Sequence, residues 1–312
     1  MTARRVRPAR HAQPARHSPA AGLGADARRG LGPGARLLDR AITVAAARAG
    51  APGGIRFTER QLYYETCRVL SPAATLLKRV PRTPAPPLRL PVFTRALDAR
   101  GRESVPGLLP PPPTSPPTRG DGPAGASEPD LYAYGLPRIL LCQDRSIARM
   151  LLANHVHLEA ACLVLAVPDA LPLDPRLTAA LRRAQGATVH VLHDASPEGV
   201  ALPARVRAAL GPVPGVRVAS IGLVPRHVAA LRLPSGRGPA PAAALGPWPP
   251  ALRPREVAWL AQGRFAEVAA VPPARLVRTV LRLTRGPRPP RTSLWSDLRG
   301  LRATGFMTWP AS

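Results

Sequence analysis

The chain has 312 residues and carries 44 lysines and arginines against 18 acidic residues, a formal net charge of +26. This balance excludes an acidic or neutral protein and favours a polyanionic partner such as DNA. Proline (42 residues) and glycine (26) are abundant while 45% of the chain is hydrophobic, so we expect folded domains separated by long unfolded stretches. Aromatic residues make up 4%, which disfavours a base-stacking platform for single strands.

The excess of positive charge has two explanations. Nearly all of it is arginine, with Lys78 as the single lysine, and arginine shares GC-rich codons with the abundant alanine, proline and glycine. One explanation of the excess is therefore codon usage, and the alternative is contact with nucleic acid. Either origin produces a surface that attracts polyanions.

Cysteines and hydropathy bear on the compartment. Cys67, Cys142 and Cys162 are too few and too widely spaced for a disulfide framework or a zinc site, so we expect buried thiols in a reducing cytosol. No apolar run approaches the roughly 20 residues that span a bilayer. The expectation is a soluble, cytoplasmic, nucleoid-associated protein with no membrane partner.

The first part of the chain predicts a basic arm followed by a small helical domain. Residues 1–35 lack a hydrophobic period and predict a disordered arm. Residues 36–80 predict two short helices joined by a glycine-rich turn, the second starting at a capping box formed by Thr58 and Gln61. This outline is typical of a winged-helix-like DNA-binding domain, with an exposed pair of tyrosines on its second helix.

Arginines of this domain are the candidate DNA contacts. Arg56, Arg60 and Arg68 lie on or beside the second predicted helix. Guanidinium groups bind phosphate oxygens well, so we expect these three residues to contact the duplex backbone.

The second part of the chain predicts a linker, an α/β domain and a tail. Residues 81–135 are crowded with proline and predict a linker, helical at most around 93–102, that lets the two domains move relative to each other. Residues 136–285 alternate strands with helices, which predicts a parallel, Rossmann-like sheet. Residues 286–312 form a basic tail. A ligand site is expected where strands end, at Asp144 and at Asp194.

The turn HDASPEGV (residues 193–200) resembles the acidic turn of Toprim domains. In that family an Asp-x-Asp-Pro-x-Gly turn and a glutamate after the first strand together hold Mg²⁺. Asp194 matches the first acid of the turn, while Ser196 stands at the second acid position. The first-strand glutamate position holds Gln143, next to Asp144.

Three further stretches narrow the resemblance to the A subunit of topoisomerase VI and its meiotic double-strand-break relatives. The stretch 215–234 is similar to the family's strand and Gly-Leu-x-Pro turn, and 260–282 to its late helical segment with a Glu-x-x-Ala element. FTERQLYYE (57–65) resembles the active-site helix, in which an arginine precedes a tyrosine pair. The alternative is a generic helix-turn-helix fused to a Rossmann-like domain.

The resemblance implies a chemistry and partners. Tyr64 would be the nucleophile that forms a 5′-phosphotyrosyl link, and Arg60 the clamp on the phosphate. A Toprim Mg²⁺ would support the leaving 3′ oxygen, with Asp194 as its secure ligand and Asp144 and Glu198 as substitutes one or two positions away. The implied partners are duplex DNA, a second copy of the chain and a GHKL-type ATPase subunit.

The departures at Gln143 and Ser196 favour a degenerate metal site. The sequence therefore predicts a duplex DNA-binding protein, similar to the topoisomerase VI A subunit, whose DNA cleavage is weak or lost. Two alternatives stay open: an active Mg²⁺-dependent DNA-cleaving transesterase using Tyr64, and a non-enzymatic interaction scaffold.

Overall fold

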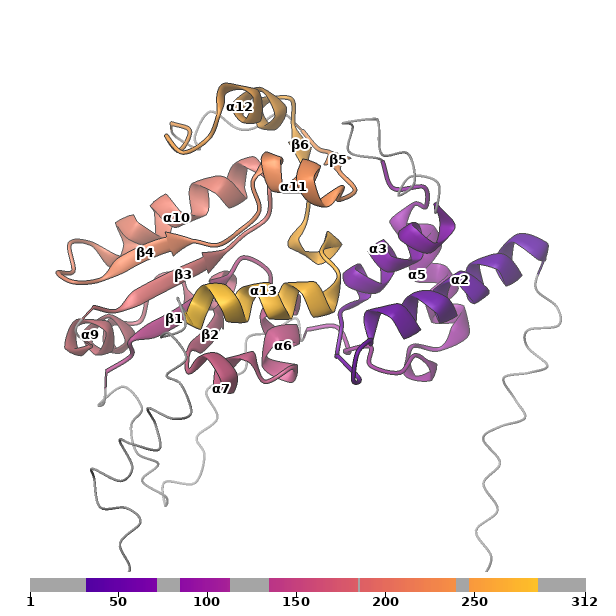
Figure 1. Cartoon of the computed structure of the whole chain (residues 1–312), viewed down its shortest axis with the longest axis horizontal. Helices are drawn as coiled ribbons and strands as arrows, with labels where there is room; N and C mark the ends of the chain where they lie inside the picture. Colours follow the sequence, from indigo (N-terminus) through magenta and orange to yellow (C-terminus); the bar gives the residue numbers. More distant parts are fainter. Residues whose placement is uncertain (1–31, 72–84, 113–134, 185, 240–246, 286–312) are drawn as a thin grey trace, which may run out of the picture.

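The computed structural model describes residues 32–71, 85–112, 135–184, 186–239 and 247–285 (Figure 1). Most of the predicted basic arm and the whole predicted tail, 286–312, lie outside these ranges. Within them, no helix combines the length and the apolar character that crossing a bilayer requires.

The N-terminal part is a group of helices. Its elements are α2 (Pro33–Ala49), α3 (Glu59–Leu70), α5 (Leu90–Arg100) and the short η1 (Arg102–Ser104). The predicted capping box is confirmed: the Gln61 backbone N–H donates to Thr58 Oγ1 (3.2 Å) and the Thr58 N–H to Gln61 Oε1 (2.9 Å). These two bonds satisfy donors that the first turn of α3 would otherwise leave free.

The helix α5 corrects the predicted linker. Phe93 and Leu97 of α5 are fully buried, and the Phe93 ring lies 5.5 Å from that of Tyr63 in an edge-on arrangement. Residues 85–112 thus complete the N-terminal core, because the apolar face of α3 needs a partner that α2 alone does not supply. An isolated bridge joins Phe57 to Leu108, and residues 32–71 and 85–112 contain no longer strand pair that would form a wing.

The predicted α/β organisation is confirmed for the second part. Four parallel strands lie in the order β2-β1-β3-β4. The elements of this region are β1 (Arg138–Cys142), α6 (Arg145–Ala153), α7 (Val156–Ala160), β2 (Leu163–Ala166), α8 (Val167–Ala170), α9 (Pro175–Arg183), β3 (Thr188–Leu192), α10 (Pro197–Leu210), β4 (Arg217–Ser220) and α11 (Pro225–Leu231). They are followed by β5 (Gly236–Arg237), α12 (Pro254–Ala261), β6 (Arg264–Phe265), η4 (Val268–Ala270) and α13 (Pro273–Arg285).

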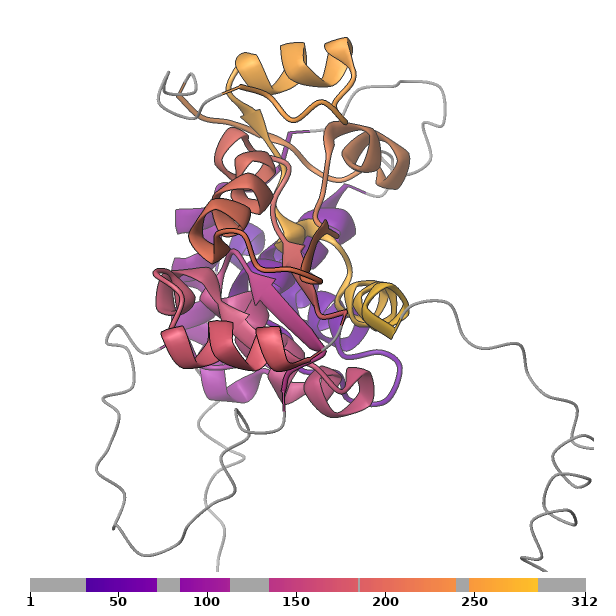
Figure 2. The ribbon, with the colours of Figure 1, turned by 90° about the vertical axis from the view of Figure 1, so that its left-hand side faces the viewer.

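Helices cover both faces of the sheet. Alternate residues of a strand point to opposite faces, so Ile139 and Leu141 pack with α9 and α10, while Leu140 and Cys142 pack with α6 and α13. Figure 2 shows α13 (yellow) on one side of the sheet and α10 on the other. Burial of both faces explains why β1 (RILLC) and β2 (LVLA) are nearly continuous apolar runs.

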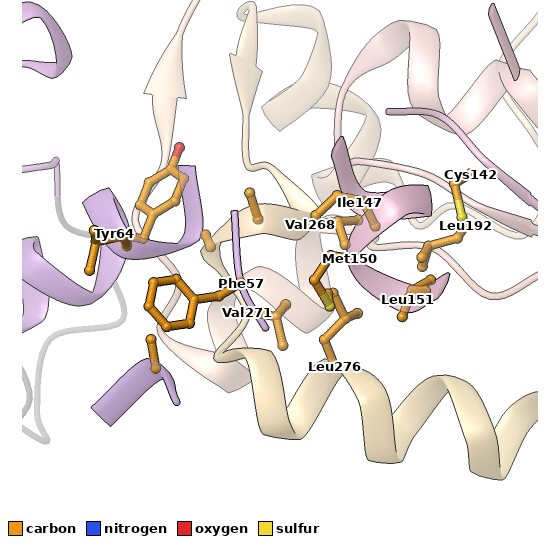
Figure 3. Packing of buried hydrophobic residues seen from close by; sticks show 14 of the residues in the cluster. Phe57, Tyr64, Cys142, Ile147, Met150, Leu151, Leu192, Val268, Val271 and Leu276 are labelled. Atoms are coloured by element: carbon orange, nitrogen blue, oxygen red, sulfur yellow. The ribbon is translucent and has the colours of Figure 1, made fainter. Parts of the chain in front are cut away.

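The two parts share one hydrophobic core. Phe57 and Tyr64 belong to the same buried cluster as Val268, Val271 and Leu276 of the C-terminal segment (Figure 3). Because the two parts bury apolar side chains against each other, the expectation of two domains moving about a hinge is wrong for the described residues. This packing places α3 next to the carboxyl ends of the parallel strands.

Candidate functional site

The candidate site lies where the strand order reverses. β1 and β3 are neighbours, with Cys142 opposite Leu192, so the predicted strand ends at Asp144 and Asp194 come together. Ligands of open parallel sheets bind at such a position. A cavity of about 80 Å³ opens there, between the sheet and α3, and it is lined by Thr58, Arg60, Asp144, Ser146, Ile147, Asp194, Glu267 and Ala269.

Asp144 is used by the helix that follows it. Its Oδ1 accepts hydrogen bonds from the backbone N–H groups of Ser146 (2.6 Å) and Ile147 (3.1 Å), which makes it the N-cap of α6. A carboxylate at a helix N-terminus is stabilised by the unpaired N–H groups and the helix dipole. The predicted metal ligand therefore has a structural role.

Asp194 is tied to the C-terminal segment. Its Oδ1 accepts a hydrogen bond from the Val268 N–H (2.6 Å), and its own N–H donates to Gln143 Oε1 (2.9 Å). Burial raises the pKa of Asp194 to about 7; the Val268 N–H opposes the shift, and the nearby Glu267 carboxylate adds to it. Gln143 thus supports the strand end as a neutral acceptor.

The remaining predicted ligand does not reach the cavity. Glu198 is exposed on the first turn of α10 and is absent from the cavity lining. Ser196 caps α10, its Oγ accepting a hydrogen bond from the Gly199 N–H (3.0 Å). Across the part of the chain that the structure describes, no three His, Cys, Asp or Glu side chains form a group that could hold a metal ion. These residues do not fit Mg²⁺, which needs several oxygen ligands free to bind it.

The tyrosine pair is buried, which corrects its predicted exposure. Tyr63 and Tyr64 are each 5% exposed, and their ring centroids lie 5.0 Å apart. The Tyr63 hydroxyl donates to the Leu88 carbonyl (2.7 Å). Most of α3 is buried, Arg60 being its one exposed residue, and both rings pack into the core cluster.

The Tyr64 hydroxyl faces Glu267. It donates a hydrogen bond to the Glu267 carboxylate, and Figure 3 shows the ring standing beside the core that joins the two parts. Burial raises the pKa of Tyr64 well above its ordinary value, and the negative charge of Glu267 adds to the shift, while Arg60 opposes it. Tyr64 therefore holds its proton, and it is not among the residues that line the cavity.

The three predicted DNA contacts have different surroundings. Arg60 is 49% exposed at the cavity and pairs with Glu267 (Nη1 to Oε1, 3.1 Å). Arg56 is exposed. Arg68 points inward, pairs with Glu65 (2.6 Å) and donates to the Ala270 carbonyl, so it connects α3 to η4 rather than facing solvent.

Glu267 is the site residue that sequence reasoning missed. Reciprocal backbone hydrogen bonds between Ala195 and Ala266 (2.9 and 3.0 Å) fix its segment beside the end of β3. Its carboxylate is 18% exposed, and burial raises its pKa while Arg60 lowers it. The Glu-x-x-Ala element did draw attention to this stretch, but only the fold shows that it meets α3.

No protein-family model, curated protein or solved structure matches this chain. The site therefore rests on its own geometry. That geometry offers a half-exposed guanidinium beside the partly buried carboxylates of Asp194 and Glu267, and a tyrosine that keeps its proton.

Proposed function

We propose that the chain binds duplex DNA and that the site at the strand ends receives a backbone phosphate without cleaving it. The observation that carries this proposal is the position of Arg60, half exposed on α3 at the mouth of the strand-end cavity. A guanidinium presents paired donors to phosphate oxygens, and the formal charge of +26 draws DNA toward the surface.

The proposal takes the N-terminal helices as a DNA-binding unit similar to a winged helix, though without a wing in residues 32–71 and 85–112, and the sheet domain as Toprim-like, similar to the topoisomerase VI A subunit. Two features support a silent site over an active one. Tyr64 is buried with its proton held, and Asp144 and Asp194 already accept backbone hydrogen bonds. A nucleophile in this state has neither the exposure nor the ionisation that attack on phosphorus needs.

A second candidate is a DNA-cleaving transesterase. It is favoured by the convergence of Arg60 and Tyr64 on α3 with Asp144 and Asp194, which lie 80 residues or more further along the chain. This function requires α3 and the Glu267 segment to separate so that Tyr64 reaches the phosphate. An interaction scaffold, the third candidate, predicts neither salt-sensitive DNA binding nor an adduct.

Arg60→Ala tests the proposal. Fluorescence anisotropy with a labelled duplex should show weaker binding by the variant and a salt slope smaller by about one unit, since one phosphate contact is lost. Arg176→Ala, an exposed arginine on α9 across the sheet, removes the same charge and serves as the matched control. Equal losses of DNA affinity in the two variants would contradict binding of a phosphate by Arg60.

A further inference from the structure

One carboxylate contacts both polar side chains that α3 presents to the strand ends. Glu267 pairs with Arg60 at 3.1 Å and accepts a hydrogen bond from the Tyr64 hydroxyl. Its position is fixed, since the adjacent Val268 N–H binds Asp194 and the preceding Ala266 pairs with Ala195. Backbone hydrogen bonds on either side of Glu267 therefore hold it in place, and its side chain lines the cavity next to Arg60 of α3.

Glu267 takes up the binding capacity of Arg60. It is the ion-pair partner that the described residues provide for this guanidinium. A carboxylate and a phosphate each present two acceptor oxygens to the paired N–H donors of an arginine, so they compete for the same donors. A DNA phosphate arriving at Arg60 meets a guanidinium already neutralised, and it meets the negative charge of Glu267 as well.

We propose that Glu267 is a built-in competitor for the DNA phosphate at Arg60, a carboxylate that must leave the guanidinium before a backbone phosphate binds there. The inference rests on the proposed function and adds its regulation. A competitor of this kind lowers the affinity for any duplex. A backbone phosphate then displaces Glu267 from Arg60 only when other contacts already hold the DNA on the protein. Glu267 is 18% exposed while Arg60 is 49% exposed, so the pair is partly shielded from solvent and opposes phosphate more strongly than a fully exposed ion pair would.

A double-mutant cycle tests this role on the full chain. Glu267→Gln keeps the size of the side chain and an oxygen that accepts from Tyr64, but it removes the charge. We expect its affinity for a labelled 20-base-pair duplex to rise about tenfold at low salt. In the Arg60→Ala background, the same change should raise affinity only about two- to threefold, because charge repulsion alone is then relieved.

Glu103→Gln is the matched control for net charge. Glu103 is exposed on η1, away from the cavity lining, so its substitution should give the small gain that general electrostatics predicts. Glu267→Ala repeats the test should the glutamine variant fail to fold, and a thermal melt of each protein monitors folding.

Each outcome decides the question. A large gain that disappears without Arg60 supports the competitor role. Equal gains in both backgrounds, or no gain, overturn this role but leave the proposed function standing as long as the unaltered protein binds duplex. Absence of duplex binding in all four proteins of the cycle overturns both.

Discussion

The carboxylate of Asp194 and the backbone N–H of Val268, 74 residues apart in the chain, are joined by a hydrogen bond of 2.6 Å. The bond ties the end of β3 to the segment that carries Glu267, and so holds Asp194 and Glu267, two of the three acids that line the cavity, in place. It forms in surroundings where burial raises the pKa of Asp194 to about 7. The stability of the fold should therefore depend on pH in part through this carboxyl group.

Proton binding decides whether the free energy of unfolding rises or falls with pH. In the unfolded chain an aspartate titrates near pH 4, whereas in the folded protein Asp194 titrates near 7, so between these values the folded state binds more protons. The free energy of unfolding should fall as pH rises through this window, by up to about 1.4 kcal/mol per pH unit, and level off above it. Asp194→Asn keeps the acceptor for Val268 and removes the dependence.

Urea unfolding of both proteins at pH 5, 6, 7 and 8 measures this effect. The difference between them isolates Asp194 from other titrating groups. As pH rises from 5 to 7, the free energy of unfolding of Asp194→Asn should increase relative to that of the unaltered protein. Parallel pH curves would show that Asp194 ionises normally in the fold.

Arg68 should contribute to stability, not to DNA binding. Its guanidinium pairs with Glu65 and donates to the Ala270 carbonyl at the contact between α3 and η4. Arg68→Ala leaves these partners unsatisfied at a largely buried position, which should lower the free energy of unfolding by about 1–3 kcal/mol. Chemical denaturation measures the loss, with Arg176→Ala as the exposed control expected within about 0.5 kcal/mol of the unaltered protein. A normal stability for Arg68→Ala would return this residue to the list of DNA contacts.

The unaltered protein should form no covalent link to DNA. Tyr64 is buried, its pKa is raised, and the Asp144 and Asp194 carboxylates of the cavity accept hydrogen bonds from backbone N–H groups. Incubation with supercoiled plasmid and Mg²⁺ or Mn²⁺, followed by detergent quenching, should give neither linear DNA nor a tyrosine-linked adduct. An adduct that Tyr64→Phe abolishes would establish the transesterase instead.

Restoring two acids should create a metal site. Gln143→Glu places a carboxylate where the present amide oxygen lies, 2.9 Å from the Asp194 nitrogen. Ser196→Asp supplies a second acid and keeps an N-cap for α10, since aspartate caps as well as serine. Calorimetry should show Mn²⁺ binding at least about tenfold tighter in the double variant, because charged oxygens replace neutral ones. The gain should vanish when Asp194→Asn is added, and a gain that survived this change would locate the metal elsewhere.

Local signals in the sequence predicted much of the fold. The capping box at Thr58 and the alternation of strands with helices over 136–285 each depend on signals a few residues long, and the structure confirms them. The meeting of Asp144 with Asp194 was also predictable, because parallel strands that are neighbours end at the same edge.

Long-range packing was beyond such signals. The burial of the tyrosine pair depends on α5 and on the segment around Val268, which no periodicity within α3 reveals. The pairing of Arg60 with Glu267 joins residues 207 positions apart, so only the fold brings them together. The helix expected around 93–102 does form, as α5, but proline content concealed its first turn, where the missing N–H of Pro91 costs nothing, and its place in the core.

The salt dependence of duplex binding tests the central claim most directly. Anisotropy titrations between 50 and 200 mM salt should show affinity falling on the order of a thousandfold if about six phosphates are engaged, because each contact releases counterions. The logarithm of the binding constant should fall linearly with the logarithm of salt concentration, with a slope near −5. An affinity that stays flat across this range, or no binding at 50 mM, would contradict the claim that this chain binds duplex DNA.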